Sequence, residues 1–118
     1  MTRIRCYLAA SETRYIVVPV RGIITGAKAV WQTTVTTSNI ITISRGTTTV
    51  CLVTAVTTAG QVMETGVPDA TNKDLVFDPA TAAYSFIKIV QSGGNAVAAD
   101  LIIEFDEYAS VTQAAKEA

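Results

Sequence analysis

Histidine is absent from this sequence, and cysteine, leucine and aromatic residues are scarce: the 118 residues include two cysteines, four leucines and eight aromatic side chains. Without histidine the chain lacks the commonest general base of enzymes and the commonest metal ligand of proteins. No apolar run approaches the roughly 18–20 residues of a membrane-spanning helix, and no apolar stretch of signal-peptide length follows the basic start. We therefore expect no enzymatic activity, no metal, no cofactor and no membrane partner.

Net charge is also nearly absent. Nine Lys and Arg residues face ten Asp and Glu residues, which gives a formal net charge of −1 and argues against a basic nucleic-acid binder. The charges are unevenly spread, because residues 1–50 carry six basic side chains and one acidic one, whereas residues 51–118 carry three basic and nine acidic ones. Separate basic and acidic faces would favour heterologous contacts, whereas a Greek-key topology would interleave the two halves.

The two cysteines, Cys6 and Cys51, fit no zinc-binding spacing. We interpret them as buried free thiols in a reducing compartment. The alternative is a Cys6–Cys51 disulfide, which requires the first strand to lie beside the strand that contains Cys51.

β-Branched residues dominate what is present: Thr, Val and Ile make up 43 of the 118 residues. Branching at Cβ restricts χ1 and suits a pleated strand better than a helix. The composition and the many short strands predict an all-β fold, an antiparallel β-sandwich or jelly roll. The length suits one domain, which we place over 1–108, followed by a tail over 109–118 with a short helix.

Alternation of apolar and polar residues predicts strands over 3–9, 14–20, 27–35, 40–44, 47–56, 84–90 and 97–108. Pro19 predicts an edge strand, and Gly22 and Gly26 are expected to bracket a bend. Arg45-Gly46 predicts a hairpin between 40–44 and 47–56. Residues 57–83 read as a long loop with short strands at 62–64 and 75–77. The predicted core comprises Ile41, Ile43, Val50, Leu52, Ile87, Ile89, Leu101, Ile103 and Phe105.

A few side chains suggest other chemistry. Glu104 and Asp106 share one strand face at a spacing that could serve acid–base catalysis, although a solvated outer face explains them as well. The Asp- and Asn-rich loop 69–78 offers oxygen ligands for calcium, but Asp and Asn are also common turn residues. A carbohydrate-binding platform would require Trp31 to be exposed beside Tyr15 or Tyr84, whereas a lone Trp in a β-domain usually lies in the core.

Charged side chains are the best candidates for partner binding. Arg3, Arg5 and Arg14 lie in the basic start, and Asp69 and Asp74 lie in the acidic loop. Charges of this kind steer assembly and make it sensitive to salt.

The chain also resembles a known group of proteins. From its basic start through the loop GVPDATNKDLVFD at 66–78 to IIEFDE at 102–107 and a short polar tail, it resembles the small β-rich virion proteins of tailed bacteriophages, in particular head decoration (cement) proteins. The resemblance implies a non-enzymatic structural protein, made in the host cytoplasm and located on the outer capsid surface of the virion. It implies binding to the major capsid protein, a homotrimer, and stabilisation of the DNA-filled head. The alternatives are a phage tail or fibre component and a carbohydrate-binding β-sandwich.

Overall fold

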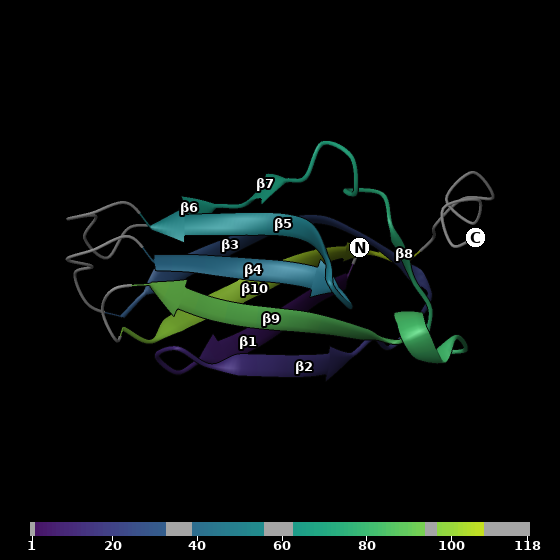
Figure 1. Ribbon diagram of the computed structural model, residues 1–118, viewed down its shortest axis with the longest axis horizontal. Helices are drawn as coiled ribbons and strands as arrows, with labels where there is room; N and C mark the ends of the chain where they lie inside the picture. Colours follow the sequence, from purple (N-terminus) through teal and green to yellow (C-terminus); the bar gives the residue numbers. More distant parts are fainter. Residues whose placement is uncertain (1, 33–38, 56–62, 94–96, 108–118) are drawn as a thin grey trace.

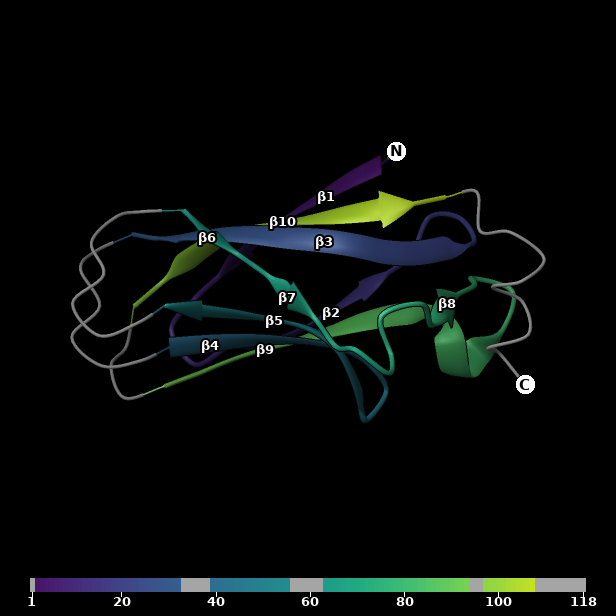
Figure 2. The same ribbon diagram turned by 90° about the horizontal axis from the view of Figure 1, so that it is seen from above.

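The structure is a computed structural model that describes residues 2–32, 39–55, 63–93 and 97–107. Two antiparallel sheets pack face to face in a sandwich with extents of 43 × 23 × 22 Å (Figures 1 and 2). Within the described ranges the only helical element is a 3₁₀ turn at Ala82–Tyr84. The expected all-β sandwich is therefore confirmed, and the expected helix at 109–118 lies outside the described residues.

The first sheet, called sheet A, has the order β1-β10-β3-β6. Its strands are β1 (Thr2–Leu8), β10 (Ala99–Asp106), β3 (Gly22–Trp31) and β6 (Glu64–Thr65), and β8 (Val76–Phe77) pairs with the start of β3. The second sheet, called sheet B, has the order β2-β9-β4-β5-β7. Its strands are β2 (Thr13–Val17), β9 (Phe86–Gly93), β4 (Asn39–Arg45), β5 (Thr48–Ala55) and β7 (Val67–Pro68).

The core lies between the inner faces of the two sheets. Phe77 and Phe105 meet edge to face there, with ring centroids 6.4 Å apart. Of the predicted core residues, all except Leu52 are buried, namely Ile41, Ile43, Val50, Ile87, Ile89, Leu101, Ile103 and Phe105.

Leu52 is the wrong member of the predicted core, because its side chain is 39% exposed. The predicted hairpin between β4 and β5 is present and turns at Gly46, whose φ is 62°. Within it, however, Ile43 pairs with Cys51 whereas Ser44 pairs with Thr49, so β5 carries one extra residue. This bulge reverses the alternation, so that Cys51 and Val53 face inward beyond it and Leu52 faces outward.

The predicted bend between Gly22 and Gly26 is also wrong, because strand β3 runs through both residues. A Cβ at Gly22 would lie 2.1 Å from the carbonyl oxygen of Asp106, so glycine allows β3 and β10 to approach closely. Gly26 lies where the pairing of β3 and β10 shifts by one residue. Both glycines therefore lie within one continuous strand and allow it to pair with β10.

The two long sides of the sandwich differ. On one side the chain passes from β6 in sheet A through Gly66 to β7 in sheet B and bridges the gap between the sheets (Figure 2). On the other side, β1 and β2 are both edge strands. The edge position that Pro19 predicted for β2 is confirmed by the sheet order, but the strand ends at Val17 and not at residue 20.

Both cysteines are buried and free, which confirms the interpretation as thiols and makes the disulfide alternative wrong. The physical reason is that Cys6 lies on the edge strand of sheet A, whereas Cys51 lies on β5 in the opposite sheet.

Candidate functional site

The outer face of sheet A is hollowed into an open groove of about 780 Å³. Strands β1, β10 and β3 supply most of its lining, and Met63 closes it on the β6 side. Because these strands are hydrogen-bonded neighbours, the positions of the lining side chains follow from the strand register rather than from loops.

Two rows of side chains cross the groove. In one row Arg5 pairs with Ile102, which in turn pairs with Lys28. Ile102 is therefore a half-buried apolar floor with a cation on each side, and the backbones of Arg5 and Lys28 are two strand spacings, about 10 Å, apart. The neighbouring row contains Tyr7 and Asp100. Tyr7 is 53% exposed and lines the groove.

The groove carries more cations than anions. Arg3, Arg5 and Lys28 line it, together with the carboxylates of Asp100 and Glu104. Within the described ranges, no carboxylate lies within 4.0 Å of these three cations, whereas Asp100 accepts a hydrogen bond from the amide of Gln32. Three cations and two carboxylates give the groove side chains a net charge of +1, and Arg5 and Lys28 are the cations that flank Ile102.

The other predicted partner-binding residues lie elsewhere. Arg14 is on the edge strand β2, where its guanidinium contacts the Glu12 carboxylate at 2.9 Å. This contact and a hydrogen bond from the backbone N–H of Ala9 lower the pKa of Glu12, and the backbone bond has the larger effect. Arg14 therefore lies outside the groove that Arg3 and Arg5 line.

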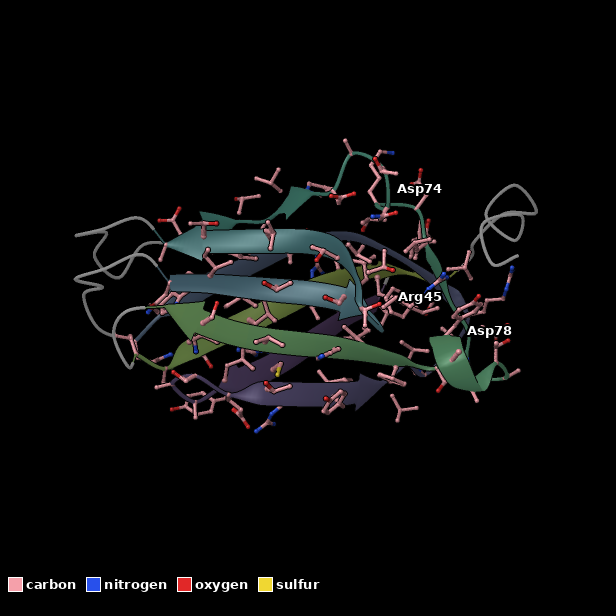
Figure 3. All side chains as sticks on the ribbon, in the orientation of Figure 1. Arg45, Asp74 and Asp78 are labelled. Carbon is pink, nitrogen blue, oxygen red and sulfur yellow. The ribbon has the colours of Figure 1, made fainter. Side chains whose placement is uncertain are left out.

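Asp69 and Asp74 lie on the segment between β7 and β8, beside the long side of the sandwich opposite β1 and β2 (Figure 3). The Asp69 carboxylate accepts hydrogen bonds from the backbone N–H groups of Thr71 and Asn72, at 3.1 and 2.9 Å. Asp74 contacts Lys73 at 3.2 Å. The Asp69 geometry is that of a local turn. Within the described ranges no group of three or more potential metal ligands is found.

The residues suggested for acid–base catalysis and for sugar binding do not share a common site. Glu104 and Asp106 both lie on the outer face of β10 and are partly exposed. Trp31 is 1% exposed and belongs to the core, so it cannot form a sugar-binding platform. The ring of Tyr84 is covered by Arg45, whose guanidinium lies 3.8 Å from the ring centroid. Arg45 also donates a hydrogen bond to the carbonyl of Val76 and so fastens β8 to the end of β4 (Figure 3).

Lys28 and Ile102 are among the groove residues that sequence reasoning did not assign to a site. The alternation of β3 and β10 places both side chains on outer faces, which is the one signal that points to them. Nothing in the sequence shows that these two strands are neighbours. The alignment of Arg5, Ile102 and Lys28 in one row is thus a product of the sheet order.

The outer face of sheet B has a different character. The register brings Tyr15, Lys88 and Ser44 into one row and Val17 and Phe86 into the next. Its exposed or half-buried side chains are mostly apolar or hydroxylated, and Lys88 is the charged residue among those rows. The two faces of the sandwich are therefore chemically distinct.

No helix within the described residues is long and apolar enough to cross a membrane. No protein family model, no curated protein and no solved structure matches this chain.

Proposed function

We propose that this chain is a non-enzymatic structural protein that docks on a protein assembly through the outer face of sheet A. In the specific form that the resemblance favours, the assembly is the outer capsid surface of a tailed bacteriophage and the partner is the major capsid protein. The protein would stabilise the DNA-filled head by bridging capsid subunits, as a homotrimer.

The row Arg5–Ile102–Lys28 carries the proposal. It sets an apolar floor between two cations that have no carboxylate partner among the described residues. Such a row complements an extended segment that is acidic and partly apolar, because the apolar contact contributes burial and the flanking charges contribute orientation. A groove on a paired sheet is rigid, so it needs little reorganisation when the partner binds.

Charge reversal in the groove tests this proposal. The double variant Arg5→Glu/Lys28→Glu should lose capture by capsids of the phage that encodes the chain, measured by co-sedimentation. The matched control is Lys73→Glu/Lys88→Glu, which changes the net charge equally but leaves the groove intact. Capture by the wild type should also weaken as salt rises, since exposed charges are screened. Equal capture by both double variants would refute docking through the groove.

Two further variants test the other predicted docking residues. Arg14→Glu and Asp74→Lys alter charges that lie outside the groove. If docking uses the groove, both single variants should be captured like the wild type. Loss of capture with either variant would move the docking surface to the β2 edge or to the segment between β7 and β8. Capture by isolated tails instead of heads would favour a tail or fibre component.

A further inference from the structure

The outer edge of β2 carries backbone groups that no described residue satisfies. Glu12 and Val18, which flank the strand, direct backbone hydrogen bonds toward β9: the Glu12 carbonyl accepts from the Gln91 N–H, and the Val18 N–H donates to the Ser85 carbonyl. Because antiparallel pairing alternates, Arg14 and Ile16 also face β9. The N–H and C=O groups of Thr13, Tyr15 and Val17 therefore point away from the sheet.

The two edge strands on this side, β1 and β2, differ in how well they are protected against pairing with another strand. The Gln32 N–H donates to the Ala98 carbonyl, which fixes the alternation in β10 and makes Arg3, Arg5 and Tyr7 the outward-directed residues of β1. Two arginines on an edge strand discourage pairing with another strand. The outward-directed residues of β2 are Thr13, Tyr15 and Val17, and none is charged. Tyr15 is 61% and Val17 73% exposed.

We propose that β2 pairs in antiparallel orientation with β2 of a second copy of this chain, about a two-fold axis at Tyr15. Tyr15 is the middle of the three outward-directed residues, so the edge complements itself. Each Tyr15 exchanges its N–H and C=O with the partner's Tyr15, and each Thr13 does so with the partner's Val17. Sheet B then continues across both molecules. Because a two-fold contact joins chains in pairs, it is separate from the contact that would hold the proposed homotrimer together.

The ends of the strand delimit this pairing. Pro19, the next residue in the outward-directed series, has no N–H to donate. At the other end Ser11 adopts a positive φ of 58° and turns the chain away from the edge. Both features coincide with the ends of the self-complementary segment, so the pairing leaves no outward N–H within it unused.

The charge and the accessibility of the β2 edge are both compatible with pairing to a second copy of this chain. Arg14 is bound by Glu12 of its own chain, so the edge brings no net charge to the interface. The ring of Tyr15 packs edge to face on Phe86, with centroids 5.8 Å apart, which presents an apolar margin beside the axis. In Figure 1, β2 forms the lowest margin of the molecule and β1 slants away from it.

Charge swapping at the axis tests the proposal. Tyr15→Lys places like charges opposite each other in the two copies and should weaken self-association by about tenfold or more, as measured by sedimentation equilibrium. Tyr15→Glu should do the same. An equimolar mixture of the two variants should recover association, because each Lys then faces a Glu. The control is Val67→Lys on β7, an exposed residue at the opposite edge of sheet B and outside the groove, and its association should equal that of the wild type. Circular dichroism confirms that each variant is folded.

Engineered cysteines on β2 test the register of the proposed pairing. Tyr15→Cys should form an intermolecular disulfide on oxidation, because the two Cα atoms of a hydrogen-bonded pair lie about 5.5 Å apart. Val17→Cys should not, since its copies are displaced from each other along the strand. A wild type that is monomeric up to near-millimolar concentration would overturn the proposal. So would a trimer that Tyr15→Lys leaves intact, and either result would leave docking through the groove untouched.

Discussion

The indole Nε1 of Trp31 donates a hydrogen bond to the side-chain oxygen of Gln91, 2.7 Å away, in the interior of the sandwich. Trp31 ends β3 in sheet A and Gln91 belongs to β9 in sheet B, so the bond ties the two sheets together. The Gln91 amide also donates to the carbonyl of Ala9, at 3.0 Å, which holds the turn between β1 and β2. One buried amide thus connects both sheets and the turn that joins their edge strands β1 and β2.

Replacing Gln91 by Leu should therefore destabilise the fold. The substitution leaves the buried Trp31 N–H without an acceptor, and an unsatisfied buried donor costs about 1–3 kcal/mol. Urea unfolding measures the loss. The control is Gln32→Leu, which removes an exposed amide that bonds to Asp100 and should change stability little. Equal losses for the two variants would show that the Trp31 bond has no special role.

Gly66 should not tolerate a side chain. A Cβ there would lie 2.7 Å from the Cys51 sulfur and 3.1 Å from the Ala27 carbonyl oxygen, which accepts the Gly66 N–H. Gly66→Ala should therefore cost about 1–3 kcal/mol by overpacking, measured as a lower urea midpoint. Gly26→Ala is the comparison, because its nearest atom is the end of the Glu104 side chain, which can move. A smaller loss at Gly66 than at Gly26 would contradict this account.

Phe105 should be among the most sensitive core positions. Its side chain is fully buried and packs on Phe77, so Phe105→Ala should cost about 3–5 kcal/mol. Phe86→Ala, at a half-buried ring on the outer face of sheet B, should cost less. A Phe105→Ala protein that unfolds like the wild type would remove Phe105 from the core.

Cys51 should make stability fall at alkaline pH. Burial raises the pKa of its thiol from 9.0 to about 11, so the native state holds this proton more tightly than the unfolded chain does. The stabilisation is complete below pH 9 and is lost as pH rises from 9 toward 11. The free energy of unfolding of the wild type should fall more steeply in that window than that of Cys51→Ala. Parallel curves for the two proteins would refute the assignment.

Local pattern was enough to predict most of the long strands and most of the core, although it missed β7 and the first five residues of β3. β-Branched residues favour extended backbone wherever they fall, and alternation assigns each side chain to a face before any partner strand is known. That is why Ile87, Ile103 and Phe105 were placed correctly, and why Pro19 indicated an edge. The hairpin at Gly46 is also predictable from local pattern, because its turn and both of its strands are close together in the sequence.

The tertiary structure decided the rest, because register and sheet order depend on strands distant in sequence. Leu52 faces outward only because a bulge opposite Ile43 shifts the pairing of β5. Arg5 and Lys28 face each other across Ile102 only because β10, from the far end of the chain, pairs between β1 and β3. The same pairing sets Glu104 beside Arg3, so the acidic half of the sequence is interleaved with the basic half. Local sequence pattern sets which residues form strands, whereas hydrogen bonding between distant strands sets which of them meet.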